Sequence, residues 1–124
     1  MGRHILIIED DRDIRKGLQL VLESEGYTVE QAENGQVALE LLKASDELPS
    51  LIILDLMMPI MDGFQFRERQ AQDLRIQDIP VIIMTADGHI EEKKFRTGAQ
   101  LALRKPADVD AILSAVNIYA KATG

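Results

Sequence analysis

The sequence predicts an α/β fold: a doubly wound sheet of five parallel strands with helices on both faces. Five short runs rich in branched apolar residues are spaced along the chain, as expected of buried strands. Segments with a helical apolar period lie between these runs and after the last one. A strand followed by a helix, repeated five times, is typical of a parallel sheet that is covered on both sides.

The predicted strands are mostly continuous in their apolar residues rather than alternating, which favours burial on both faces. Pro80 comes directly before the fourth run, where a proline removes no hydrogen bond between strands. The five runs are residues 5–8, 27–32, 51–54, 81–84 and 101–103.

The first two helices are predicted from apolar residues that recur at helical spacing. The first follows Asp11 or Asp13, either of which can cap it, and Gly26 marks its end. The second follows the pair Asn34-Gly35. The apolar stripes are Ile14, Leu18, Val21 and Leu22 in the first helix and Val37, Ala38, Leu41 and Leu42 in the second.

The other three helices are predicted largely from the residues at their ends. The third begins near Gly63. A strongly polar fourth helix covers residues 89–96 and ends at Gly98. The fifth begins after Pro106, with Asp108 as a candidate cap. Its apolar stripe is Val109, Ile112, Leu113 and Val116.

Length, charge and composition limit the class of protein. The 124 residues fit one compact domain, so residues 1–124 are expected to form a single domain. No cysteine is present, which excludes disulfides and thiolate metal sites. A formal net charge of -7 argues against a nucleic-acid surface, and the first apolar run is too short for a signal peptide or a membrane span. We therefore expect a soluble, cytoplasmic protein that binds neither nucleic acid nor membrane.

The carboxyl ends of the predicted strands carry the residues suited to chemistry. Glu9 and Asp10 follow the first strand, Asp55 the third, Thr85 the fourth and Lys105 the fifth. In a parallel sheet these ends share one edge, where ligands bind. Clustered carboxylates repel one another, so a hard divalent cation such as Mg²⁺ is expected to neutralise them, with the lysine as a further positive charge.

Such a site can accept a phosphoryl group. Asp55 is the expected nucleophile, and the metal ion, Lys105 and Thr85 would hold the oxygens of the transferred group. Each of these residues taken alone has a plainer explanation, as a helix cap, a strand residue or a surface charge. Their joint placement at one sheet edge favours the phosphoacceptor. The two histidines, His4 and His89, are expected to be exposed and to bind no metal.

Four motifs, IIEDD, LIILDLMMPIMDG, VIIMTA and LRKPA, occur along the chain in this order. Together, their order and spacing resemble the CheY-like receiver domain of response regulators in two-component signalling, over about residues 3–121. The resemblance implies a flavodoxin-like three-layer sandwich whose parallel sheet has the strand order 2-1-3-4-5.

The resemblance also implies the ligands of the metal ion and the phosphoacceptor. Asp55 would accept the phosphoryl group and also bind the metal. Asp10 would bind Mg²⁺ directly, or Mn²⁺ in its place, and Glu9 would act through water. The backbone carbonyl of Met57 would be a further ligand.

Two more residues are implied to act on the phosphoryl group itself. Thr85 would be the switch hydroxyl that turns toward it, and Lys105 would be the phosphate-binding lysine. The peptide bond between Lys105 and Pro106 would be cis, as is usual in the family.

For partners, the resemblance implies a sensor histidine kinase or a phosphotransfer protein as the donor and a downstream protein as the target. The target would bind through the fourth helix, the fifth strand and the fifth helix. The chain would be a monomer, with a dimer as the alternative when phosphorylated. It would be a signalling switch rather than an enzyme, supporting only its own phosphotransfer and dephosphorylation.

Two positions depart from the family pattern. Ala102 stands where the family usually has an aromatic residue, often Tyr, three positions before the lysine. Ala107 stands where the family often has Phe. The usual aromatic relay of the phosphorylation signal is therefore not expected in this chain, although phosphoacceptance is.

Two alternative functions remain beside this one. A haloacid-dehalogenase-type aspartyl phosphatase also places an Asp at a strand end with Mg²⁺, but that family needs a second Asp two residues later, and this chain has Met57 there. The chain also leaves no room for a cap domain. A degenerate receiver that binds partners without taking phosphate is the other alternative, and the intact set of site residues argues against it.

Overall fold

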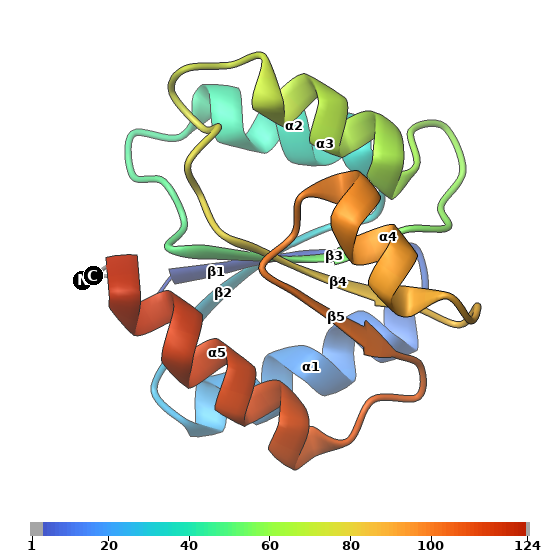
Figure 1. The fold of residues 1–124 in the computed structure, drawn as a ribbon. Coiled ribbons are helices and arrows are strands. Elements are labelled where there is room, and N and C mark those ends of the chain that lie inside the picture. The colour runs from blue at the N-terminus through green and yellow to red at the C-terminus, as the bar shows by residue number, and fades with distance from the viewer. Residues whose placement is uncertain (1–3, 124) are drawn as a thin grey trace.

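The computed structural model describes the backbone of residues 4–123 and the side chains of residues 4–120. In this part of the chain, strands and helices alternate as predicted (Figure 1). The strands are β1 His4–Ile8, β2 Thr28–Ala32, β3 Leu51–Asp55, β4 Val81–Thr85 and β5 Leu101–Arg104, and the helices are α1 Arg12–Ser24, α2 Gly35–Ala44, α3 Gly63–Ala71, α4 Ile90–Thr97 and α5 Val109–Thr123.

The five strands run parallel in one sheet, in the order β2-β1-β3-β4-β5. The predicted fold class is therefore confirmed, and so is the strand order that the resemblance implied. Every residue of β3 and β4 is buried, which explains why their sequences are apolar without alternation. β2 forms one edge of the sheet and is only partly buried, in keeping with its more polar sequence, TVEQA.

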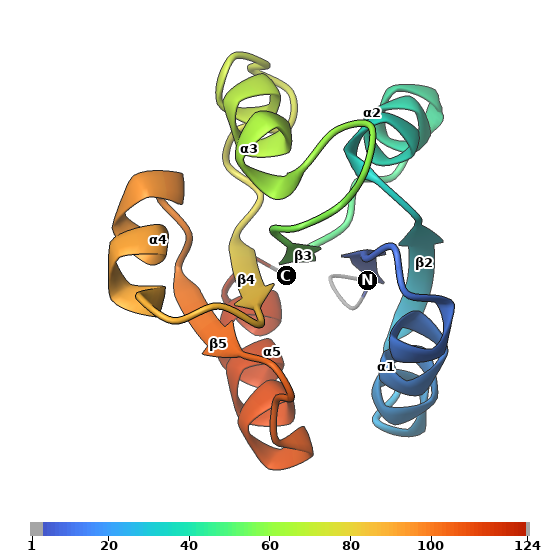
Figure 2. The same ribbon diagram turned by 90° about the vertical axis from the view of Figure 1, so that its right-hand side faces the viewer.

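Helices cover both faces of the sheet. α1 and α5 lie on one face, and α2, α3 and α4 lie on the other (Figures 1 and 2). Successive strand residues point to opposite faces. In β1, Leu6 and Ile8 join the core beneath α2 and α3, whereas Ile5 and Ile7 join the core beneath α1 and α5. None of the helices within residues 4–123 combines the length and the apolar character needed to cross a membrane.

Side-chain caps fix where three of the helices begin. Asp11, rather than the alternative Asp13, caps α1, because its carboxylate accepts hydrogen bonds from the first backbone N–H groups of the helix. Asn34 caps α2 through a bond from Val37 N–H, and Asp62 caps α3 in a capping box. The helix starts therefore follow from local sequence chemistry.

The structure corrects the prediction at two histidines. The helix predicted from residue 89 begins at Ile90, because His89 has a left-handed backbone with φ of 57° and belongs to the preceding loop. Its side chain is exposed, as predicted. His4 was expected to be exposed, and this is wrong: it is the first residue of β1, is half-buried and pairs with Glu30 of β2.

Candidate functional site

The carboxyl ends of the strands bring together the residues singled out in the sequence. Asp55 is the last residue of β3, and Thr85 is the last residue of β4. These strands are neighbours, and Asp55 pairs with Met84, the residue directly before Thr85. Glu9 and Asp10 follow β1, which lies on the other side of β3, and Lys105 follows β5. The parallel topology therefore places all five at one edge of the sheet.

Three carboxyl groups form the centre of this site. One carboxylate oxygen from each of Glu9, Asp10 and Asp55 lies within 4.8 Å of the others. Glu9 and Asp55 are only 2% and 4% exposed, whereas Asp10 is exposed to solvent. Hard divalent cations such as Mg²⁺ prefer oxygen donors and negative charge, and they keep several waters when bound. The two buried acids and the one solvent-facing acid therefore fit a magnesium site.

Lys105 supplies the positive charge that the structure places against these acids. Its Nζ lies 2.5 Å from Glu9 Oε1 and 3.3 Å from Asp55 Oδ1. Burial alone would lower the pKa of Lys105, but its interactions with Glu9 and Asp55 outweigh burial and raise the pKa. The side chain is therefore a fixed ammonium, able to bridge the two buried carboxyl groups.

Burial opposes the charged form of both Glu9 and Asp55, and Lys105 offsets this effect only in part. Burial raises the pKa of Glu9 to about 7, although the hydrogen bond from Lys105 acts in the opposite direction. Burial also raises the pKa of Asp55 above its ordinary value. A divalent cation would favour the charged form of both groups, so the electrostatics of the site agree with its oxygen-donor geometry.

The loop between β3 and α3 holds the Asp55 side chain. Asp55 Oδ1 accepts a hydrogen bond of 3.3 Å from the N–H of Met57. The loop closes on Gly63, whose N–H donates to Leu56 O at 2.9 Å; a Cβ there would lie 2.7 Å from Asp55 O, so a side chain does not fit. Met57 is 60% exposed, and its contact with the Asp55 side chain is through the backbone N–H. Its predicted role as a carbonyl ligand stays a prediction.

Thr85 is fully buried beside this cluster, at the point where β4 passes into the loop to α4. Its hydroxyl oxygen accepts a hydrogen bond of 3.3 Å from the N–H of Asp87. Its carbonyl accepts a bond of 2.8 Å from the N–H of Lys105, which ties the ends of β4 and β5 together. The bond between Lys105 and Pro106 is cis, as the resemblance implied.

One residue of the site was not found from the sequence. Arg15 of α1 donates from Nη1 to Glu9 O at 2.6 Å and to Asp10 O at 3.2 Å. It therefore holds the backbone that presents both acids. The sequence feature that could have indicated this role is the position of Arg15, a long cationic residue about one turn into the helix that follows Glu9 and Asp10.

Comparison with known proteins identifies the family. The family model of the response regulator receiver domain matches residues 5–117, which is most of the chain. The fold and the cluster of acids at the sheet edge are those of a receiver domain, and the chain belongs to the response regulator receiver domain family.

Curated relatives agree with this assignment. The chain is 42% identical over 121 residues to the DNA-binding dual master transcriptional regulator RpaA of Synechocystis sp., covering 96% of this chain and 49% of that protein. It is 38% identical over 121 residues to sporulation initiation phosphotransferase F of Bacillus subtilis, covering 96% of this chain and 94% of that protein. The chain thus spans about half the length of RpaA and nearly all of phosphotransferase F.

Solved structures are similar over the same length. A putative response regulator from Chloroflexus aurantiacus superposes with a TM-score of 0.87 at 30% identity, covering 96% of this chain and 98% of that one. The response regulator TrrA from Thermotoga maritima, in complex with Mg²⁺ and BeF, superposes with a TM-score of 0.81 at 27% identity, covering 94% and 98%.

Proposed function

We propose that this receiver domain accepts a phosphoryl group on Asp55 in a Mg²⁺-dependent reaction and changes conformation as a result. The observation that carries the proposal is the meeting of the Glu9, Asp10 and Asp55 carboxyl groups, within 4.8 Å of one another, with Lys105 at one sheet edge. A buried carboxylate with a fixed ammonium beside it has the charges that phosphoryl transfer needs.

In the proposed reaction an Asp55 carboxylate oxygen attacks the phosphorus of a donor phosphohistidine. The O–P bond to Asp55 forms, the P–N bond to histidine breaks, and the electron pair of the broken bond stays on the histidine nitrogen. The chain's own contribution is to hold Asp55 in place through the Met57 N–H and to place Lys105 and the Thr85 hydroxyl near the phosphoryl oxygens. Mg²⁺, held by Asp10, Asp55 and the Met57 carbonyl with Glu9 acting through water, would neutralise charge on those oxygens.

Two of the similar proteins support this reading. Phosphotransferase F is matched over nearly its whole length, and TrrA carries Mg²⁺ and BeF in its solved structure. We propose Mg²⁺ as the resident metal of this chain on that basis and on its oxygen donors. Because the receiver is a switch, any hydrolysis it supports would be that of its own aspartyl phosphate.

We further propose a sensor histidine kinase or a phosphotransfer protein as donor, docking at the edge beside Lys105. An apolar cavity of about 500 Å³ lies there, between α1 and α5. Ala107, where the family often has Phe, and Gly17, where a Cβ would meet nothing within 4 Å, are among the small residues that leave this space. An apolar wall next to the phosphoacceptor offers a donor protein surface to bury.

The downstream partner is proposed to be a protein that binds α4, β5 and α5, which lie together on one side of the molecule (Figures 1 and 2). Phe95 of α4 and Ile118 of α5 are 88% and 63% exposed, and a partner that covered them would gain free energy from burying their apolar surface. We also propose that the chain is a cytoplasmic monomer and that this domain contacts no nucleic acid. RpaA is named as DNA-binding, but this chain spans only half of it.

The test is intact-mass spectrometry after incubation with acetyl phosphate. We expect one phosphoryl adduct with Mg²⁺, none with a chelator and none in Asp55→Asn. Asp46→Asn, which changes an exposed acid outside the site, is the matched control and should react like the wild type. An adduct of equal yield in Asp55→Asn would overturn the assignment. Sustained turnover of a phosphate monoester would instead favour a phosphatase, although the Met57 side chain cannot transfer a proton.

A further inference from the structure

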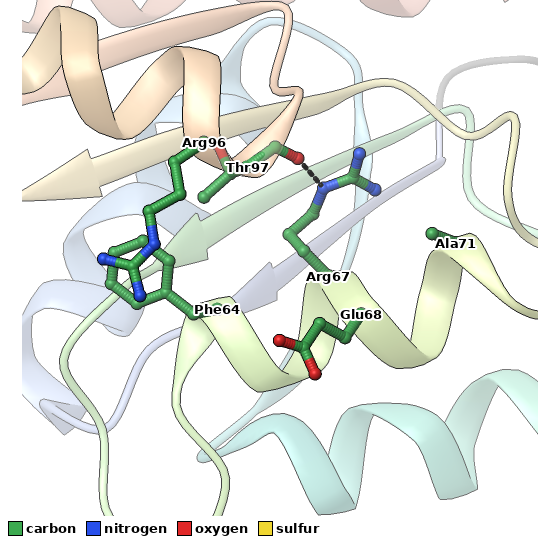
Figure 3. Close-up of a pocket in the computed structure, with 6 residues that line it drawn as sticks. All are labelled: Phe64, Arg67, Glu68, Ala71, Arg96 and Thr97. Carbon is green, nitrogen blue, oxygen red and sulfur yellow. Dashed lines mark hydrogen bonds between the residues drawn. The ribbon is translucent and has the colours of Figure 1, made fainter.

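Two arginines tie α3 and α4 together from opposite directions (Figure 3). Arg67 extends from α3 to the end of α4, where its Nε donates to Thr97 O at 2.8 Å. Arg96 extends from α4 onto α3, where its guanidinium carbon lies 4.1 Å from the centroid of the Phe64 ring. These side chains line a cavity of about 210 Å³ between the two helices. The position of α4 therefore depends on side chains of α3.

The contact of Arg67 with Thr97 is well placed to hold the end of α4. The Thr97 carbonyl belongs to the last turn of the helix, where carbonyl groups lack partners within the helix, and a cation suits the negative end of its dipole. Nη1 of Arg67 also donates to Gln70 Oε1 at 2.5 Å. Because Arg67 is half-buried, loss of these bonds would leave a partly desolvated charge.

A continuous series of contacts joins Thr97, at the end of α4, to the hydroxyl of Thr85. Thr97 Oγ1 donates to Lys93 O at 2.8 Å, one turn back along α4. Lys93 Nζ lies 3.4 Å from Asp87 Oδ2 and donates to Gly88 O at 3.0 Å, so it ties α4 to the loop that precedes it. The N–H of Asp87 donates to Thr85 Oγ1 at 3.3 Å. Thr85 is thus connected through the loop and α4 to Arg67.

We propose that Arg67 is a positioning residue of the switch, holding α4 in the arrangement that accompanies the unphosphorylated state. The inference rests on the proposed function. When the Thr85 hydroxyl turns toward a phosphoryl group, it no longer accepts the hydrogen bond from Asp87. The loop is then free to move, and Lys93 transmits its movement to α4. As α4 moves, the hydrogen bond from Arg67 Nε to Thr97 O must lengthen, or Arg67 must donate to another acceptor.

In this chain the loop after β4 and helix α4 are expected to carry the response to phosphorylation, for a physical reason. Ala102 of β5 is buried and has only a methyl group, so it cannot swing to follow Thr85. We place the hinge of this movement at Gly88 and His89, because glycine adopts many backbone angles at little steric cost and His89 has a left-handed backbone. A ligand shifts a conformational equilibrium only by its differential affinity for the two states. A contact made in one state alone, as we propose for that between Arg67 and Thr97, therefore shifts that equilibrium.

The first test follows the Arg67 Nε–H signal by nuclear magnetic resonance in the full chain, with Mg²⁺, before and after adding beryllofluoride. We expect this signal and the amide of Gly98 to shift in the wild type. In Lys93→Met, amides 55–57 should still shift, but the Arg67 shift should fall to less than half. Lys94→Met is the control and should keep the full shift. The Lys94 side chain makes no hydrogen bond or ion pair within the part of the chain that the structure describes.

The second test measures affinities in Arg67→Met and in its control, Arg69→Met, which changes an exposed arginine of the same helix. Removing a contact that favours the unswitched state should tighten beryllofluoride binding about two- to fivefold and leave Mg²⁺ affinity unchanged. A merely structural role would change both affinities or neither. An unshifted Arg67 signal in a wild type whose amides 55–57 and 85–92 do shift would overturn this inference alone. No shift at amides 55–57 would overturn the proposed function, and this inference with it.

Discussion

Lys105 lies closer to Glu9 than to Asp55, with its Nζ at 2.5 Å from Glu9 Oε1 and at 3.3 Å from Asp55 Oδ1. The lysine therefore pairs chiefly with an acid assigned to the metal side of the site, and only secondarily with the proposed nucleophile. A cation that binds among the acids competes with Lys105 for Glu9. Its arrival would leave the ammonium free to act on the phosphoryl oxygens.

This competition predicts opposite effects of one substitution on two properties. Lys105→Met should tighten Mg²⁺ binding roughly three- to tenfold, because the competing positive charge is lost, while slowing phosphorylation by acetyl phosphate. Calorimetric titration gives the first quantity and intact-mass kinetics the second. Lys16→Met, an exposed lysine of α1, should change neither. Weaker metal binding in Lys105→Met would show that the lysine supports the metal site instead.

Mg²⁺ should stabilise the folded chain against heat. A ligand that binds only the native state adds about 2.7 kcal/mol at a hundredfold excess over its Kd, and here it also relieves repulsion among three acids. Scanning calorimetry with and without Mg²⁺ should therefore show a higher melting temperature with the metal, and Asp10→Ala should shrink the difference. Asp13→Ala changes a nearby exposed acid outside the cluster and should keep it. An equal shift in Asp10→Ala would place the metal elsewhere.

Arg15 should matter for metal binding without touching the metal. Its guanidinium fixes the backbone carbonyls of Glu9 and Asp10, and residues that orient metal ligands typically affect affinity about 10- to 100-fold. We expect Arg15→Met to weaken Mg²⁺ binding by about tenfold in a calorimetric titration. Arg12→Met, an exposed arginine of the same helix, is the comparison. Identical affinities in the two variants would contradict the role given to Arg15.

Arg75 should stabilise the fold rather than the site. It lies in the connection between α3 and β4, and its Nη1 donates to Leu42 O at 2.5 Å while Nη2 donates to Ser45 O, at the end of α2. Arg75→Met leaves those carbonyls without their charged donor and should lower the free energy of unfolding by roughly 1 to 3 kcal/mol. Urea unfolding measures the change against Arg69→Met. A midpoint equal to that of the control would contradict this prediction.

The switch should be muted on β5. Since Ala102 has no side chain to reorient, the response to phosphorylation should appear in the loop after Thr85 and at the start of α4. An amide map with Mg²⁺ and beryllofluoride should show large shifts at residues 55–60, 85–92 and 105 and small ones at 100–103. If residues 100–103 and α5 shifted as much as the loop, another side chain would have to replace the missing aromatic.

Sequence alone was enough to predict the fold and the gathering of the acids and Lys105 at one edge of the sheet, although it did not reveal Arg15. The apolar runs are continuous because β3 and β4 are buried on both faces, and that pattern depends only on composition and period. Parallel strands end at a common edge, so residues that follow them in the sequence must gather there. Glu9, Asp55 and Lys105 could therefore be placed together without knowing any distance.

Tertiary structure decided which of these groups pair and what holds them. Three contacts depend on distances between elements and on the course of long side chains. They are the ion pair of Lys105 with Glu9, the hydrogen bond from Arg15 to the backbone carbonyl of Glu9, and the hydrogen bond from Arg67 to Thr97. No periodicity in the sequence encodes such distances. His4 shows the same limit: it was expected to be exposed, but the register of β1 against β2 places Glu30 diagonally across from it, and the two side chains pair.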